Sequence, residues 1–209
     1  MGFLQGWRRP KDIERRTFEA IVEDFRKLVG PLRTMGVKLG DAWGQGEPVI
    51  NGDCVSFNGL GACGCTPVKN PLVQQIMSRL LENFVTAPNL QVAAQRTLVE
   101  HGVEYRDDHF DIDWGQRRCP GCCTYENFHF PRVQRMRDSP AYLNEAVKTN
   151  RRPYDLAVSA FLLIAKKHIG SGFEIHSDGR DAWWDEPREL CQRVLGYGVD
   201  MRLESCRAA

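Results

Sequence analysis

Six of the eight cysteines in this sequence fall within its first 123 residues, and five of these lie in two short motifs. The motifs are Cys63-Gly64-Cys65 and Cys119-Pro120-Gly121-Cys122, with Cys123 directly after the second. The N-terminus becomes charged before an apolar run of signal-peptide length can develop, so we expect a cytoplasmic protein. Thiols in that compartment are reduced, which makes them available as metal ligands.

Cys119 and Cys122 have the spacing with which a tight turn presents two thiolates to one metal ion. The run Arg118-Cys-Pro-Gly-Cys122 resembles the knuckle of zinc-ribbon and rubredoxin-like sites, in which proline commonly follows the first cysteine. It departs from that pattern at Cys123, where the knuckle usually has glycine. Cys123 is therefore a candidate spare ligand.

A structural zinc site requires four ligands. The simplest second pair is Cys63 and Cys65, because Gly64 allows both thiolates to turn inward. We therefore predict a structural Zn²⁺ bound by Cys63, Cys65, Cys119 and Cys122. The reserve ligands are Cys54, Cys123, His109 and His129.

Two alternatives to a metal site stay open. In the first, the cysteines are free thiols that pack as small apolar side chains. In the second, Cys119 and Cys122 form a redox-active dithiol, which requires a helix N-terminus after Cys119 to lower its pKa. The residues after Cys123 look like a strand, which disfavours the redox alternative.

The segment between Gln116 and Arg152 contains eight basic and three acidic residues. Such a segment could contact phosphates, with Tyr125 and Phe128 available to stack on bases. The alternative is a solvated surface of mixed charge. The residues of the predicted nucleic-acid or partner surface are Arg117, Arg118, Arg132, Arg135 and Arg137.

Polar residues also gather near the C-terminus. His176 and the turn Ser177-Asp178-Gly179 could carry function, as loops often do, or could simply be a strand end. No nucleophile elbow, phosphate loop or paired-histidine metalloprotease motif is present. The sequence therefore favours a protein that is not an enzyme, without deciding the question.

Hydrophobic periodicity predicts the elements that position these residues. Apolar residues three and four positions apart predict helices over 12–29, 71–85, 89–102, 154–168 and 186–195. Short apolar or alternating runs predict strands at 49–50 or 55–57, within 103–114, and at 128–130, 173–175 and 199–203. Together they predict an α+β fold, a single domain with short antiparallel strands, about five helices and a zinc knuckle in its middle.

Domain boundaries are less clearly encoded. The polar segment 131–152 contains two prolines and is the expected hinge. If two regions exist, they are an N-terminal α+β region over 1–135, which carries the predicted zinc site, and an α-β-α-β region over 153–205. One continuous domain is the alternative.

Charge and hydropathy limit the partners. The 28 Lys and Arg residues nearly balance the 27 Asp and Glu residues, so there is no global attraction to nucleic acid or to an anionic membrane. The longest apolar stretch, 157–165, is about half of the ~20 residues needed to span a bilayer. We therefore expect no membrane association.

The C-terminal sequence carries a family resemblance. Phe173-Glu-Ile-His-Ser-Asp-Gly179, then Trp184 and Leu190-Cys-Gln-Arg-Val-Leu-Gly-Tyr-Gly198, resembles the C-terminal segment of small uncharacterised proteins encoded by bacteriophages and prophages. The resemblance implies a phage accessory protein in the bacterial cytoplasm and brings no catalytic residues with it.

The leading hypothesis is therefore a non-enzymatic phage protein, stabilised by structural zinc, that binds a host protein or protein complex, as inhibitors of host defence or metabolism do. Two alternatives stay open. One is a zinc protein that binds nucleic acid through residues 116–152. The other is a metal- or thiol-dependent enzyme that uses the cysteines, His176 and Asp178.

Overall fold

The computed structural model describes residues 3–65, 117–134 and 142–204, with isolated positions between 79 and 110. The chain divides into two compact units. The larger combines residues 1–66 and 117–209, and residues 67–116 form the smaller one. In the smaller unit, β5 (Tyr105–Arg106) pairs with β6 (His109–Phe110). The predicted helices 71–85 and 89–102 lie largely outside the described residues.

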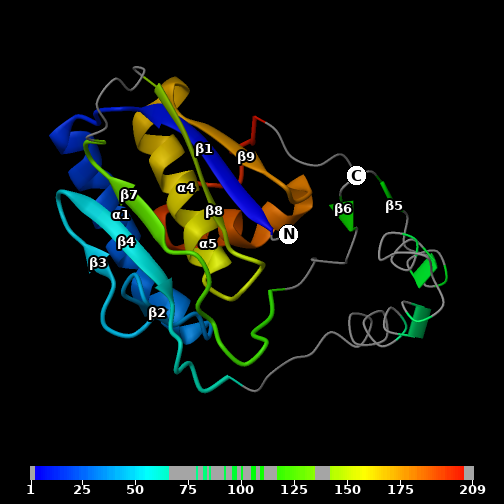
Figure 1. Ribbon diagram of the computed structural model, residues 1–209. Coiled ribbons are helices and arrows are strands. Elements are labelled where there is room, and N and C mark those ends of the chain that lie inside the picture. Colours follow the sequence, from blue (N-terminus) through cyan, green and yellow to red (C-terminus); the bar gives the residue numbers. More distant parts are fainter. Residues whose placement is uncertain are drawn as a thin grey trace. The chain divides into compact units, whose positions relative to one another are not determined.

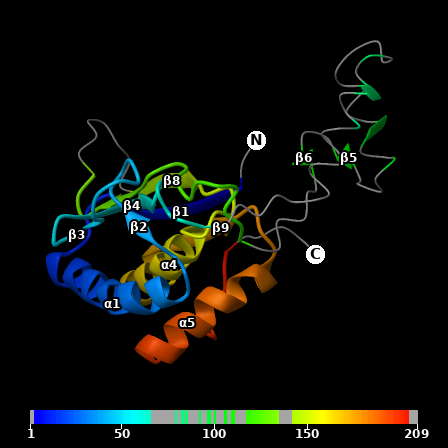
Figure 2. The same ribbon diagram turned by 90° about the horizontal axis from the view of Figure 1, so that it is seen from below.

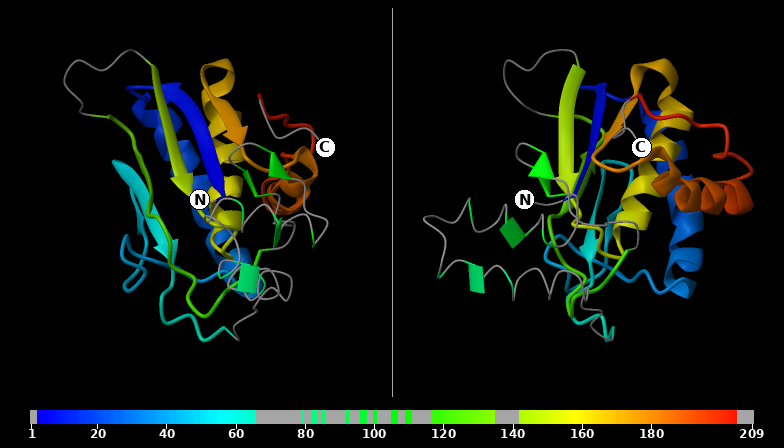
Figure 3. Two further views of the ribbon diagram at one scale, coloured as in Figure 1. Left: turned by 45° about the vertical axis from the view of Figure 1, so that its right-hand side comes forward. Right: turned by 90° about the vertical axis from the view of Figure 1, so that its right-hand side faces the viewer.

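A layer of strands covers a layer of helices in the larger unit (Figures 1 and 2). One antiparallel sheet has the order β8-β1-β9, formed by Tyr142–Lys148, Leu4–Pro10 and Glu174–Ser177. These three strands run side by side in Figure 3. In the second sheet, β4 (Cys54–Gly59) pairs with β2 (Leu39–Gly40), β3 (Val49–Ile50) and β7 (Phe128–Pro131).

The helices are α1 (Arg15–Thr34) and α4 (Asp155–Ile169), which lie beneath the strands, and α5 (Asp185–Leu195), which lies on the far side of these two helices (Figure 2). The helix α1 begins where the Glu14 carboxylate accepts from the Thr17 N–H at 2.9 Å. It continues through Pro31, where the sequence predicts its end, because Leu28 and Leu32 extend the same buried stripe. Residues 155–165 of α4 are all buried, which makes α4 the central helix.

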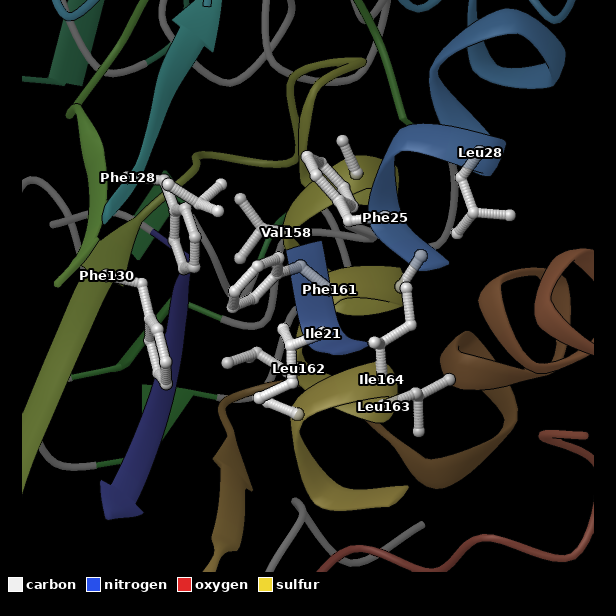
Figure 4. Close-up of a cluster of buried hydrophobic side chains, with 14 of the residues drawn as sticks. Ile21, Phe25, Leu28, Phe128, Phe130, Val158, Phe161, Leu162, Leu163 and Ile164 are labelled. Carbon is white, nitrogen blue, oxygen red and sulfur yellow. The ribbon is translucent and has the colours of Figure 1, made fainter. Parts of the chain in front are cut away.

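Aromatic side chains fill the space between the layers (Figure 4). The Phe161 ring on α4 contacts Phe25, Phe128 and Phe130 edge-on, with centroids 5.0–5.2 Å apart. Phe25 comes from α1 and the other two from β7, so a single ring joins two helices to a strand. Edge-to-face contacts of this kind add to the stabilisation from burial.

The predicted count of about five helices is wrong: the described residues contain three α-helices. They also contain seven strands in the two antiparallel sheets of the larger unit, besides the pair β5 and β6. The expected single domain divides into two units. The segment 131–152, expected to be a hinge, contains strand β8 (Tyr142–Lys148). The strand predicted at 199–203 is not formed. No helix in the described part of the chain is long and apolar enough to cross a membrane.

Candidate metal centre

Four cysteines converge in the larger unit. The sulfur atoms of Cys63, Cys65, Cys119 and Cys123 all lie within 4.8 Å of one another. Cys63 Sγ is 3.6 Å from Cys119 Sγ, and Cys65 Sγ is 3.7 Å from Cys123 Sγ. Tetrahedral zinc with Zn–S bonds of about 2.3 Å holds its sulfurs about 3.8 Å apart. The cluster therefore has the dimensions of a four-thiolate metal site.

Two loops supply these ligands. Cys63 and Cys65 follow β4, and Gly64 between them has a φ of +68°, a conformation that favours glycine. The Cys63 carbonyl accepts from Lys38 Nζ at 2.7 Å, which holds this loop against residues that precede β2. Cys119 and Cys123 lie in the loop before β7, and three of the four ligands are buried.

The loop that contains Cys119 and Cys123 is anchored on the turn before α4. The Arg118 N–H donates to the Arg151 carbonyl at 2.9 Å. The Arg152 guanidinium donates to the Cys122 carbonyl at 2.7 Å and also to the Thr124 carbonyl. The loop thus depends on contacts more than 25 residues away in the sequence.

Gly59, at the end of β4, allows the two metal-site loops to meet. A Cβ atom at this position would lie 2.0 Å from the Cys123 carbonyl oxygen, well inside van der Waals contact. The carbonyl of Gly59 accepts from Thr124 Oγ1 at 2.8 Å. The absence of a side chain at Gly59 therefore sets the position of Cys123.

We expect Gly59→Ala to displace Cys123 and to weaken metal binding by about 5- to 150-fold, since overpacking costs about 1–3 kcal/mol. The measurement is a competition titration of Zn²⁺ against a chromophoric chelator. Gly30→Ala is the control: Gly30 lies in α1, and a Cβ atom there would meet no other atom within 4 Å, so this change should stabilise the helix and leave zinc affinity unchanged. Equal zinc affinity in wild type and Gly59→Ala would contradict the expectation.

The thiols already share protons through hydrogen bonds. Burial by itself raises the pKa of the Cys63 thiol, but hydrogen bonds from the Cys65 N–H and the other three thiols lower it to about 6. Burial and donation to neighbouring thiols raise the pKa of Cys65 and of Cys123. Cys63 therefore ionises easily, and its negative charge then opposes the ionisation of the neighbouring thiols. A bound cation would remove this opposition.

The structure brings together three of the four predicted ligands, with Cys123 in place of Cys122. Both residues lie in the irregular loop before β7, where Cys123 is buried in the cluster and Cys122 is half-buried outside it. Among the reserves, Cys54 lies in β4 and His129 in β7, and neither belongs to the cluster found among the described residues. His109 lies in β6 of the smaller unit.

The predicted basic surface is only partly exposed. Arg117 turns inward and forms an ion pair with Asp155 at 2.9 Å, with 9% of its side chain exposed. Arg132 is half-buried and donates to the Ile13 carbonyl at 3.3 Å, and Arg118 is half-buried as well. Arg135 and Arg137 lie outside the described residues. Of the two aromatic residues expected to stack on bases, Phe128 is fully buried and Tyr125 is 38% exposed.

The polar turn after β9 has structural contacts. The Asp178 carboxylate accepts from the Leu4 N–H at 3.0 Å, and Ser177 Oγ accepts from the Gly179 N–H at 3.0 Å. His176 Nε2 lies 3.7 Å from the Glu174 carboxylate. The Asp178 contact joins this turn to β1, and the other two contacts lie within β9 and the turn itself. Together they support the interpretation of this turn as a strand end.

A buried carboxylate of the larger unit has no signal in the sequence. Asp155, at the start of α4, is fully buried and accepts from four side chains at 2.6–3.0 Å. The four donors are Gln5, Arg117, Thr149 and Arg151. No sequence pattern links these residues, because Gln5 is 150 positions from Asp155.

The turn that contributes to this network has a strained backbone. Asn150 and Arg151 both have φ of +50°, an uncommon conformation for residues other than glycine. The Arg151 guanidinium lies over the rings of Phe3 and Trp183, about 5 Å from each centroid. Since the Arg151 carbonyl also accepts from Arg118, this strained turn connects the buried carboxylate to the metal-site loop.

No family, curated protein or solved structure matches this chain. The function therefore has to follow from the geometry of the chain itself. That geometry includes a four-cysteine cluster that could hold a metal ion.

Proposed function

We propose that this protein is a binding protein rather than an enzyme, and that its four cysteines hold a structural zinc ion. The proposal is carried by the convergence of four thiols within 4.8 Å. Structural zinc sites use four protein ligands, whereas catalytic sites keep one position for water or substrate. A tetrahedral set of four sulfurs suits zinc or iron, and zinc is the common structural choice.

The zinc ion would join the two halves of the larger unit. Cys63 and Cys65 end its first chain segment, and Cys119 and Cys123 begin its second, so residues 67–116 are inserted between the two ligand pairs. Besides the sulfur contacts, the segment that leads to Cys63 meets the Cys123 loop where Thr124 Oγ1 donates to the Gly59 carbonyl. A metal ion would hold both ends of the insertion at one point.

The partner is proposed to be a macromolecule. The tail resemblance supports a host protein or protein complex met by a phage accessory protein. A different observation favours the second candidate, nucleic acid: two exposed aromatic side chains, Trp43 and Tyr125, line one pocket beside the metal-site loop. Exposed aromatic residues of this kind are common in binding sites.

We expect one zinc ion per chain in protein purified without chelator, measured by elemental analysis. Removal of the ion should destabilise the protein by about 3 kcal/mol or more, because ligands that bind only the folded state stabilise it. For a chain of this size, that corresponds to a fall in Tm of about 6–12 °C. Readdition of Zn²⁺ should restore the Tm, whereas Mg²⁺ should not. A metal-free protein whose Tm does not respond to zinc would contradict the proposal.

A further inference from the structure

We infer that the pocket between Trp43 and Tyr125 binds an unstacked base of single-stranded nucleic acid, an inference that rests on the proposed binding function and specifies its ligand. The pocket has a volume of about 310 Å³. Its lining residues are Ala42, Trp43, Asn58, Thr124, Tyr125 and Asn127. This volume is at the small end for ligand sites and suits one planar ring better than a folded segment.

Trp43 is held in an exposed position by an ordered loop. Its side chain is 80% exposed. The Asp41 carboxylate accepts from the backbone N–H groups of Trp43 and Gln45 at 2.9 and 3.0 Å, which shapes the turn. Gly44 has a φ of +72°, and a Cβ atom there would lie 2.3 Å from Thr124 Oγ1. The loop is therefore packed closely while its largest apolar side chain faces solvent.

Tyr125 completes the aromatic lining from the other side. It follows Cys123 of the four-sulfur cluster by two residues, and its backbone N–H donates to Asn58 Oδ1 at 2.9 Å. The Arg152 guanidinium lies 5.0 Å from the centre of the Tyr125 ring. Aromatic rings and guanidinium planes are the groups on which proteins stack single-stranded bases.

Two asparagines lie in the pocket lining, of which Asn58 is buried and holds the two loops together, while Asn127 can offer polar groups to a ligand. Asn58 Nδ2 donates to the carbonyls of Ala42 and Tyr125 at 3.2 and 2.9 Å and so joins the two aromatic loops. Asn127 accepts from Ser56 Oγ at 3.2 Å through its Oδ1, which leaves its amide protons as the donors it can offer a ligand. Side-chain amides suit the hydrogen-bonding edges of bases.

Cations contact the same segment of chain. Arg152 lies over Tyr125, and Lys148 pairs with Glu126 at 3.9 Å while about half of its side chain remains exposed. These groups could each neutralise one phosphate, so we expect a shallow salt dependence with a slope of about one or two. Stacking should therefore contribute more to affinity than charge.

The test is fluorescence anisotropy of labelled 12-nucleotide thymidine and uridine oligomers with zinc-loaded protein. We expect Trp43→Ala to weaken binding about tenfold or more, as removal of a stacking residue does. Tyr125→Ala should weaken it as well. Met35→Ala, which removes a 40% exposed apolar side chain at the end of α1, is the matched control and should bind like wild type. The Tm of each variant checks that it is folded.

Equal affinity of wild type and Trp43→Ala, or no binding of either oligomer at millimolar concentration, would overturn the inference. Binding of peptides but not oligomers by wild type, lost in Trp43→Ala, would overturn it in favour of a protein partner. Zinc is measured on the same samples. If the protein holds one zinc ion per chain but binds neither oligomer, this inference alone is refuted. If the protein holds no zinc, the structural metal site is refuted.

Discussion

Replacement of Cys123 by serine is expected to abolish stoichiometric zinc binding and to lower the free energy of unfolding by more than about 4 kcal/mol, whereas Cys122→Ser should change neither quantity measurably. The two cysteines are neighbours in the chain, but only Cys123 belongs to the four-sulfur cluster. Serine offers a weaker and harder ligand atom than a thiolate, and the remaining three thiols cannot complete a tetrahedral site.

The measurements are zinc content by elemental analysis and urea unfolding followed by circular dichroism. Because the two variants differ by one position and carry the same substitution, they control for general effects of losing a thiol. If Cys122→Ser lost zinc while Cys123→Ser kept it, the ligand set predicted from the sequence would be correct and the four-sulfur geometry would be wrong. If both variants kept zinc, the cluster would not be the metal site.

Asp155→Asn is expected to destabilise the protein by about 3–5 kcal/mol. Asparagine preserves the shape of the side chain but removes the charge that faces two buried guanidinium groups, those of Arg117 and Arg151. Arg151 is 4% exposed and would lose the carboxylate with which it forms its buried ion pair. An uncompensated buried charge is one of the costliest changes in a folded protein.

The effect of Asp155→Asn should depend on pH. Burial by itself raises the pKa of Asp155, but Arg117, Arg151 and the hydrogen bonds from Thr149 and Gln5 outweigh it and hold this pKa below its usual range. A lowered pKa in the folded state stabilises the protein above the unfolded value of about 3.9, and the stabilisation is lost as the pH falls through the folded value. The difference from wild type should therefore be full at neutral pH and shrink below about pH 4.

Asp53→Asn is the matched control. Its carboxylate is 84% exposed and lies 4.0 Å from Arg15, so the substitution should cost less than about 1 kcal/mol at any pH. Urea unfolding between pH 3 and pH 7 measures the free energy of unfolding of each variant and of wild type as a function of pH. A cost for Asp155→Asn as small as that for Asp53→Asn would mean that the buried network contributes little to stability.

The buried carboxylate and the metal centre are expected to support each other. Arg151 donates to Asp155, and its carbonyl accepts from Arg118, the residue before Cys119. Loss of the carboxylate should thus loosen the turn that anchors one ligand loop. The zinc affinity of Asp155→Asn, measured under native conditions, is a direct readout of this link.

The amino-acid sequence alone determined the elements whose signal is local. The apolar stripe of α1 and the apolar run of α4 identify both helices. Each pattern of apolar residues repeats within a few positions of the chain, so it can be read from the sequence. Clustering of cysteines identified a candidate metal site and three of its four members. Strand β8 was missed because its polar residues resemble a linker until β1 pairs with them.

Tertiary structure decided how residues distant in sequence meet. It selected Cys123 over Cys122, turned Arg117 away from solvent toward Asp155, and brought Gln5 to a carboxylate 150 positions away. It also left Trp43 exposed beside Tyr125. Periodicity encodes which face of an element is buried. Contacts between distant side chains depend instead on how whole elements pack against one another. A shift of one residue along a strand, for example, reverses which side chains face inward.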